Sequence, residues 1–297
     1  MEGEDKSKRK ILAIVNPFSG SKKKEKIVSR LQRELNSNSI SFDYLYTQYS
    51  GHGKEIAQNA ILNDMDTIIA IGGDGTINEV SSQLIGSKTK LGIISLGSGN
   101  GFARHLKVHK SLDESIQIIK NNTPILVDSC KVNQQSYVNI AGIGIDGKVA
   151  YLTRNNSKRG LWPYVKATIS AGFSYGAFEA ELCYDNKCIY GKYKAIVIAN
   201  GPLYGFNFQI APQASVQDGL LDVMLFEDAS FLKYSFELPK FVSGKLDKSK
   251  SVVNFKTKEL KVVLKEKQHT HVDGEGLYSD ALEYNYSINP KSLKILV

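Results

Sequence analysis

The sequence contains no long apolar run. None of its stretches reaches the roughly 20 apolar residues that a membrane-spanning helix needs. The first ten residues are mostly charged and include no apolar segment, so we expect no secretory signal. These two absences exclude a helical membrane protein and favour a cytoplasmic location.

Cysteine is scarce, with three in 297 residues, and no spacing of Cys and His is typical of a metal site. Cys183 and Cys188 flank Asp185-Asn186, a predicted two-residue hairpin turn, so a disulfide between them is geometrically possible. Without a secretory signal we expect reduced thiols instead. For His269 and His271, two apart on a predicted strand, we expect surface positions.

Acidic residues are fewer than basic ones, 30 against 38, which gives a formal net charge of +8. This excess favours an anionic partner, although it also serves solubility alone. The densest basic cluster follows an Asn-Pro-Phe-Ser-Gly turn, where it would attract phosphate or form a solvated helix face. It consists of Lys22, Lys23, Lys24 and Lys26.

Predicted strands at 10–15, 41–47, 67–71 and 91–96 alternate with predicted helices, which indicates a parallel, doubly wound sheet. Turns rich in Gly, Ser and Asn follow three of these strands, at 16–20, 72–76 and 97–101. Because ligands bind at the carboxyl ends of such strands, the turns predict a phosphate-bearing ligand. Asp74 would repel a phosphate unless a divalent metal lay between them.

After Pro124 the pattern changes to a helical region at about 146–176 and then a series of strands. Strands without intervening helices are typical of an antiparallel β domain. We therefore predict an α/β plus β protein with a cleft between two domains. A doubly wound nucleotide-binding domain covers 9–128, with 283–297 returning to it, and a mainly antiparallel β-sandwich domain covers 129–282.

Several acidic residues stand beside apolar or glycine-rich segments. Asp128 lies inside an apolar strand and needs a metal, a salt bridge or backbone contacts. Asp218 and Asp222 enclose Gly-Leu-Leu, while Asp273 and Glu275 enclose a single glycine, so turn roles are possible for each. Together with the three loops they suggest phosphoryl transfer, which needs a metal and a carboxylate that accepts a hydroxyl proton.

The segment Gly72-Gly73-Asp74-Gly75-Thr76-Ile77-Asn78-Glu79-Val80 resembles the signature of the diacylglycerol kinase catalytic family in its compact bacterial form. Supporting segments follow in the expected order at 16–20, 97–104, 218–223 and 272–275. The resemblance implies an ATP-dependent lipid kinase that transfers the γ-phosphate to a lipid hydroxyl. The third loop departs from the usual pattern at Ser98 and Gly101 and resembles sphingosine and ceramide kinases, so a diacylglycerol-like and a sphingoid acceptor both stay open.

The resemblance also implies roles for individual residues. Glu275 would be the general base, assisted by Asp273. Mg²⁺ would be bound by Asp218 and the backbone carbonyls of Ser215 and Leu220, and water and metal would connect Asp74 and Asp128 to Asp218. The residues around ATP would be Asn16, Pro17, Phe18, Ser19, Gly20, Thr47, Gly73, Asp74, Gly75, Thr76, Ile77, Asn78, Glu79 and Ser98.

Two other functions stay open. An NAD kinase-like enzyme shares the Gly-Gly-Asp-Gly loop, but Asn78-Glu79 follows that loop directly and no clear downstream Asn-Glu pair exists. A catalytically silent regulator that binds nucleotide or lipid is the second.

A lipid substrate implies a peripheral membrane contact and no nucleic-acid partner; a homodimer is possible. The candidate contact is Leu161–Phe173 with Lys158, Arg159 and Lys166, for which an ordinary packed helix is the alternative.

Overall fold

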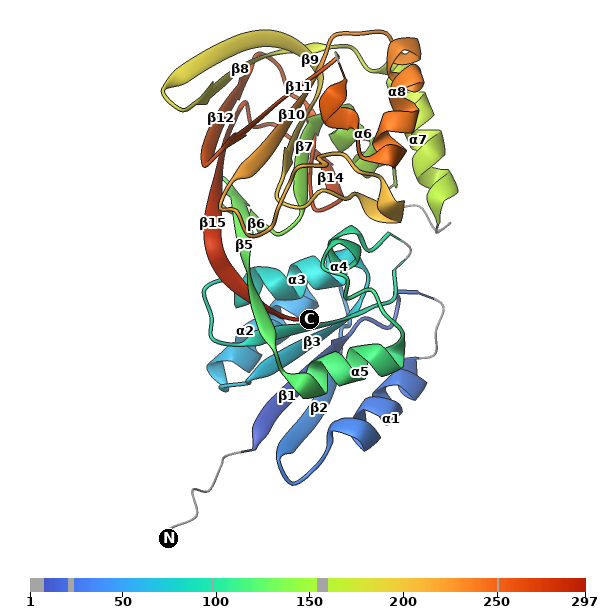
Figure 1. Cartoon of the computed structure of the whole chain (residues 1–297), viewed down its shortest axis with the longest axis vertical. Helices are drawn as coiled ribbons and strands as arrows, with labels where there is room; N and C mark the ends of the chain where they lie inside the picture. Colours follow the sequence, from blue (N-terminus) through green and yellow to red (C-terminus); the bar gives the residue numbers. More distant parts are fainter. Residues whose placement is uncertain (1–7, 21–23, 98, 154–159, 250) are drawn as a thin grey trace. The chain divides into compact units, whose positions relative to one another are not determined.

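The computed structural model describes residues 8–20, 24–97, 99–153, 160–249 and 251–297 (Figure 1). The chain forms two compact units, unit 1 with residues 1–127 and 292–297, and unit 2 with residues 128–291. The segment that returns to unit 1 is shorter than the predicted 283–297, because the first part of β15 (Glu283–Leu296) pairs with a strand of unit 2.

Unit 1 contains a parallel sheet in the order β2–β1–β3–β4–β15, to which β15 contributes its C-terminal end through Ile295 and Leu91. All six residues of the central strand β3 are buried, as a strand covered on both faces requires. The other strands are β1 (Arg9–Val15), β2 (Ile40–Tyr46) and β4 (Lys90–Ser95), and β3 is Thr67–Gly72.

Helices cover both faces of this sheet (Figure 1). Ile27, Leu31 and Leu35 lie on one side of α1 and pack on Ile69 and Ile71 of β3, which is the spacing of an amphipathic helix. Helix α5 packs with α1, and α2 packs with α3. The helices are α1 (Lys24–Leu35), α2 (His52–Leu62), α3 (Asp74–Leu84), α4 (Gly101–His105) and α5 (Leu112–Asn121).

Unit 2 is mainly antiparallel, which confirms the predicted fold class. Its longest path runs β14–β13–β7–β9–β8–β12–β15. The long strand β9 pairs with β7 and β8 and also with β10, which in turn pairs with β11. The strands are β5 (Pro124–Val132), β6 (Gln135–Tyr137), β7 (Ile140–Gly144), β8 (Phe178–Tyr184), β9 (Lys187–Ala199), β10 (Leu221–Glu227), β11 (Val252–Thr257), β12 (Glu259–Leu264), β13 (His269–Val272) and β14 (Glu275–Tyr278).

The described part of unit 2 contains the α-helices α6 (Ile145–Thr153), α7 (Leu161–Ser174) and α8 (Phe231–Ser243). Helix α8 was not predicted, although its ends carry ordinary signals. The Ser230 hydroxyl accepts the Lys233 N–H at its start, and Gly244 ends it in the left-handed conformation. Within the described ranges, no helix is both long and apolar enough to cross a bilayer.

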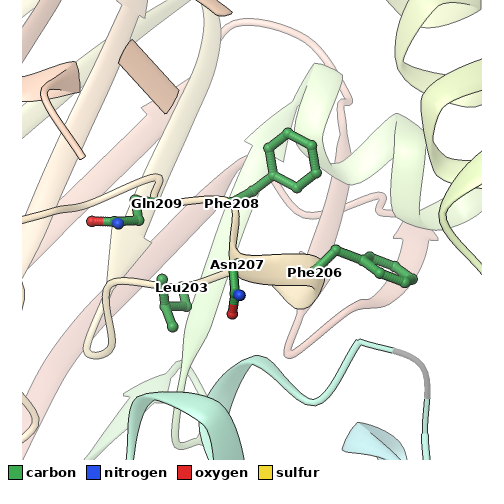
Figure 2. A pocket seen from close by; sticks show the side chains of 5 residues that line it. All are labelled: Leu203, Phe206, Asn207, Phe208 and Gln209. Carbon is green, nitrogen blue, oxygen red and sulfur yellow. The ribbon is translucent and has the colours of Figure 1, made fainter. Parts of the chain in front are cut away.

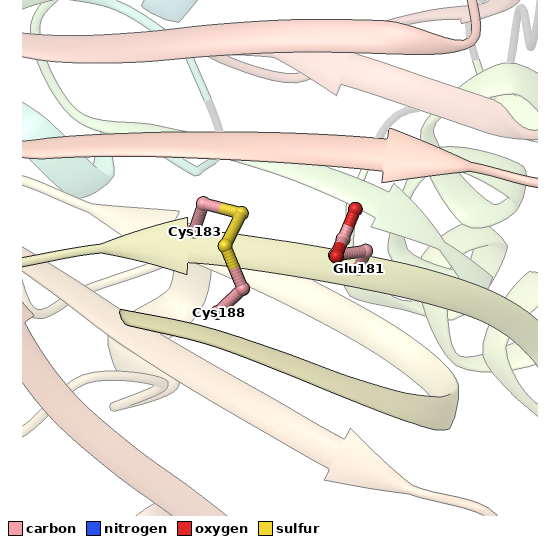
Figure 3. Close-up of side chains that lie close together, drawn as sticks. All are labelled: Glu181, Cys183 and Cys188. Carbon is pink, nitrogen blue, oxygen red and sulfur yellow. A yellow bond between two sulfur atoms is a disulfide. The ribbon is translucent and has the colours of Figure 1, made fainter. Parts of the chain in front are cut away.

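The predicted hairpin turn at Asp185-Asn186 has positive φ angles at both residues, 46° and 60°, as a type I′ turn requires. The register puts Cys183 directly opposite Cys188, with 4.1 Å between their Cα atoms, and the two form a disulfide (Figure 3). The expectation of reduced thiols is therefore wrong. It rested on the expected compartment, whereas the hairpin register decides whether the two sulfur atoms meet.

Candidate active site

Hydrogen bonds join the three predicted loops at the carboxyl ends of β1, β3 and β4. The Asn16 side-chain amide donates to Thr76 Oγ1 over 3.0 Å. The Asn100 N–H donates to Asp74 Oδ2 over 2.8 Å, and the Leu96 N–H donates to the Gly72 carbonyl. Each loop thus contacts the second one, and all three lie at one edge of the parallel sheet of unit 1.

Two glycines are needed because the loop backbones touch. A Cβ atom on Gly97 would lie 2.9 Å from Gly73 Cα. One on Gly20, which has a φ of +61°, would lie 2.4 Å from the Leu96 carbonyl oxygen. Side chains at these positions would separate the loops.

The residues predicted to surround ATP differ in burial and in the contacts that their side chains already make. Ile77 is 1% exposed and its side chain faces the core, so it could contribute only its backbone. The Glu79 carboxylate accepts the N–H groups of Gly51 and Gly53 and so holds the first turn of α2, which follows the buried Thr47. Gly73 and Asp74 are half-buried, Thr76 and Asn78 are buried, and Gly75 is exposed.

The first loop is an Asx turn in which Asn16 Oδ1 accepts the Phe18 N–H. Pro17 and Phe18 are exposed, and the Ser19 hydroxyl donates to the Asn16 carbonyl. Lys24 Nζ lies 3.3 Å from the Gly20 carbonyl, which sets a cation beside this loop. Lys22, Lys23 and Ser98 lie outside the described residues.

In unit 2, Asp128 is fully buried and makes the backbone contacts that were the alternative to a metal role. Its Oδ1 accepts the Lys291 N–H over 2.7 Å, and its Oδ2 accepts the Gly219 N–H over 2.8 Å. Both carboxylate oxygens are therefore used to hold backbone. These contacts support a role in fixing the loop of Asp218 and the chain at Lys291.

Lys256 lies directly beside Asp218, the predicted magnesium ligand. No sequence pattern pointed to this lysine. Its Nζ lies 2.7 Å from Asp218 Oδ2 and 3.1 Å from Asp222 Oδ2, and it donates to the Gln213 carbonyl. Burial raises the pKa of Asp222 to about 6, although Lys256 opposes the shift. The ammonium group thus supplies the positive charge that these carboxylates need.

The described residues do not fit a magnesium ion at Asp218. Its Oδ1 accepts the Leu220 N–H and its Oδ2 is held by the ammonium, so a divalent ion there would lie against a cation of the chain. The Ser215 carbonyl, the second predicted ligand, accepts the Asp218 N–H over 3.5 Å. Across the described residues, the group of three His, Cys, Asp or Glu atoms within metal-binding distance is Glu181 with the two disulfide cysteines.

The Asp-Gly-Glu segment forms the turn between β13 and β14, where Val272 pairs with Glu275. The Asp273 carboxylate accepts three backbone N–H groups, those of residues 138, 139 and 140, over 2.9–3.0 Å. These contacts make Asp273 an anchor of the turn. Glu275 begins β14 with an exposed side chain.

The expectation that His271 lies on the surface is wrong, since it is 3% exposed. Its Nε2 lies 2.6 Å from Asp146 Oδ2, which also accepts the Tyr204 hydroxyl. Burial lowers the pKa of His271, but Asp146 outweighs burial and the net shift is upward. His269 is half-buried against the rings of Tyr151, Tyr175 and Tyr278.

A cavity of about 440 Å³ lies beside the loop that follows β9, in unit 2 (Figure 2). Its wall combines apolar and amide side chains. The Phe206 ring lies 6.0 Å from that of Tyr164 in α7. The lining residues are Leu203, Phe206, Asn207, Phe208 and Gln209.

Comparison with known proteins identifies both parts of the chain. Residues 10–132 match the diacylglycerol kinase catalytic domain, and residues 139–297 match the YegS C-terminal NAD kinase beta sandwich-like domain. The chain belongs to the diacylglycerol kinase family. Membership in this kinase family confirms the prediction of a phosphotransferase with an alcohol acceptor.

Individual relatives in this family align with most of the chain. The diacylglycerol kinase of Bacillus subtilis is 27% identical over 267 residues, which cover 88% of each chain. That of Staphylococcus haemolyticus is 26% identical and covers 92% of this chain and 83% of its own. A crystal structure of a diacylglycerol kinase from Bacillus anthracis shares the fold with a TM-score of 0.73 at 21% identity, covering 97% and 96% of the two chains.

Because Lys256 contacts two carboxylates, we expect Lys256→Met to destabilise the protein. The variant should lose about 2 kcal/mol of stability, because it leaves the nearly buried Asp222 without its counter-ion. Thermal unfolding at several pH values measures the loss. Since the folded state raises the pKa of Asp222, the loss should be largest above pH 7 and smaller near pH 5, where a protonated Asp222 needs no cation.

Lys258→Met, an exposed lysine on the same edge, is the control and should unfold like the wild type. Equal unfolding temperatures for Lys256→Met and Lys258→Met at pH 8 would contradict the role of Lys256.

Proposed function

We propose that this protein is an ATP-dependent lipid kinase that transfers the γ-phosphate of magnesium-bound ATP to the hydroxyl of a diacylglycerol-like lipid. The observation that carries the proposal is the convergence of three loops at one edge of the parallel sheet, held by Asn16–Thr76 and Asp74–Asn100. Backbone approach at Gly20, Gly73 and Gly97 and the start of α3 suit a phosphate chain.

The nucleotide would contact the first loop, Asn16 to Gly20, and the second, Gly73 to Asn78. Lys24 and Arg104, which donate to carbonyls of the first and third loops, supply nearby positive charge. Glu79 would support this site by holding the start of α2. Thr47, whose N–H donates to the Val15 carbonyl at the end of β1, would lie beside the nucleotide, and Ser98 would contribute its hydroxyl. Magnesium enters as part of the ATP substrate and shields the phosphate charge.

Glu275 is the proposed general base. As the lipid oxygen bonds to the γ-phosphorus, its proton passes to the Glu275 carboxylate, the bond to the β–γ bridging oxygen breaks, and ADP leaves. Asp273 holds the turn by its three backbone contacts. The apolar part of the cavity, at Leu203, Phe206 and Phe208, suits part of an acyl chain.

Diacylglycerol is the first acceptor to test, because the relatives from Bacillus subtilis and Staphylococcus haemolyticus carry that name and align over most of this chain. The third loop, with Gly101 in place of an acidic residue, keeps a sphingoid acceptor as the second candidate.

An acceptor assay tests the function. Purified protein with labelled MgATP should put label into the organic phase when given diacylglycerol, or a sphingoid base if that is the acceptor. The control supplies NAD in place of lipid and should yield no labelled NADP. Label in NADP with none in lipid would make the protein an NAD kinase, and no transfer to either would favour a silent regulator.

Glu275→Gln tests the base. The amide cannot accept the proton, so kcat should fall at least about 100-fold, while ATP affinity measured by calorimetry should stay within twofold. Glu259→Gln, an exposed residue of β12, is the matched control. A Glu275→Gln enzyme with wild-type kcat would remove this residue from the mechanism.

Helix α7 is the proposed membrane contact. Its buried residues are the small Ala167, Ala171 and Gly172, whereas its large apolar residues face outward, the reverse of an ordinary packed helix. Lys166 adds an exposed cation, and an interface of aromatic and basic side chains suits an anionic bilayer. Lys158 and Arg159 lie outside the described residues. The exposed apolar residues are Leu161, Trp162, Tyr164, Ile169 and Phe173.

Trp162→Ala should weaken binding to sedimented anionic vesicles roughly 30-fold, because burial of the 82% exposed indole in the interface would contribute about 2 kcal/mol. Leu62→Ala, which removes a 76% exposed apolar side chain from unit 1, should bind vesicles like the wild type. Equal binding by wild type and Trp162→Ala would place the membrane contact elsewhere.

A further inference from the structure

A buried polar chain in unit 2 ends at the turn that carries Glu275. It runs from the Tyr204 hydroxyl to Asp146, at the start of α6, then to His271 in β13 and to the N–H of Gly274. No step of the proposed reaction uses Asp146 or His271. Both are nevertheless withdrawn from solvent, with 17% and 3% of their side chains exposed.

The contacts determine which nitrogen of His271 carries the proton. The Gly274 N–H donates to Nδ1 over 3.2 Å, so Nδ1 is the unprotonated acceptor. Nε2 then carries the hydrogen and donates to Asp146 Oδ2 over 2.6 Å. The ring thus accepts from the turn on one side and donates to the helix on the other.

The neighbouring backbone leaves room for this pair. A Cβ atom on Gly142 of β7 would lie 2.0 Å from Asp146 Oδ2 and 2.8 Å from His271 Nε2. A Cβ atom on Gly276 would lie 2.2 Å from the Tyr151 backbone nitrogen of α6. Gly142 and Gly276 therefore let β7 pack directly on the Asp146–His271 hydrogen bond and β14 pack directly on α6, which fixes the turn against that helix.

Asp273 and Gly274 form a two-residue hairpin turn. Their φ angles of +46° and +86° are those of a type I′ turn, for which Asp-Gly is a favoured pair. Three N–H groups hold the Asp273 side, and the His271 ring holds the Gly274 side. Glu275 follows directly in the chain.

We propose that the Asp146–His271 pair positions Glu275 for catalysis by fixing the Gly274 peptide group through His271 Nδ1. The inference rests on the proposed role of Glu275 as base. His271 is a positioning residue that touches no substrate. Asp146 keeps the ring in the tautomer that can accept from Gly274, and the Tyr204 hydroxyl donates to the same Oδ2 atom.

Two substitutions of His271 test its two contacts separately, the one at Nδ1 and the one at Nε2. His271→Asn keeps an oxygen near the position of Nδ1, where it can accept from Gly274, but loses Asp146. His271→Gln reaches Asp146 but offers no acceptor at the Nδ1 position. We expect His271→Gln to lower kcat at least tenfold with the KM for ATP within twofold, and His271→Asn to keep at least a third of the wild-type kcat.

The ¹⁵N–¹H resonance of Gly274 reports the contact without any need for activity. It should move upfield in His271→Gln and stay near its wild-type position in His271→Asn. Kinetic measurements are made at temperatures where circular dichroism shows each variant to be folded. A role in stability alone predicts similar kcat values for the two variants, and that result would overturn the proposal.

Glu275→Gln, measured alongside, distinguishes the two possible failures. If Glu275→Gln is inactive and His271→Gln keeps the wild-type kcat, the positioning role fails and the base role stands. If Glu275→Gln keeps its activity, the base role fails and the positioning proposal falls with it.

Discussion

Carboxylates that accept backbone N–H groups hold the loops of both units in place. Asp74 accepts from the third loop, Glu79 from the start of α2, Asp128 from two separate segments, and Asp273 from three consecutive residues. Loop backbone lacks the partners that helices and sheets provide, and an ionised carboxylate makes strong hydrogen bonds to such groups. The position of each functional loop therefore depends on an acidic residue beside it.

The same residues were candidates for metal binding and catalysis because acidic side chains near glycines suggest phosphoryl transfer. Their contacts distinguish the acids that hold loop backbone from the acid that has an exposed side chain. Asp128 and Asp273 spend their oxygens on backbone, whereas Glu275 stands at the exposed start of a strand. A carboxylate that already accepts two or three N–H groups is a poor base, since protonation would cost those bonds.

Unit 2 supplies its remaining buried acids with partners of its own. Lys256 lies between Asp218 and Asp222, and the His271 ring donates to Asp146. The ammonium offsets charge with charge, and the imidazole satisfies its carboxylate with a hydrogen bond. Lys256 lies where a metal ion was expected, and His271 continues the hydrogen bonds from Asp146 to the turn before Glu275.

The sequence by itself determined the strand–helix alternation of unit 1, the antiparallel character of unit 2 and the three glycine-containing loops, because periodicity and turn chemistry are local properties. It did not reveal Lys256, Asp146 or His271 as partners. Their significance depends on residues 34, 38 and 125 positions away in the chain. Helix α8 was missed although its caps are local signals, because the strands around it dominated the pattern. The hairpin that sets Cys183 opposite Cys188 is local and was predicted, but only the structure shows that the two sulfur atoms are bonded. Only the tertiary structure decided that Asp128 binds backbone, since its partners Gly219 and Lys291 lie 91 and 163 positions away and are brought to it by packing.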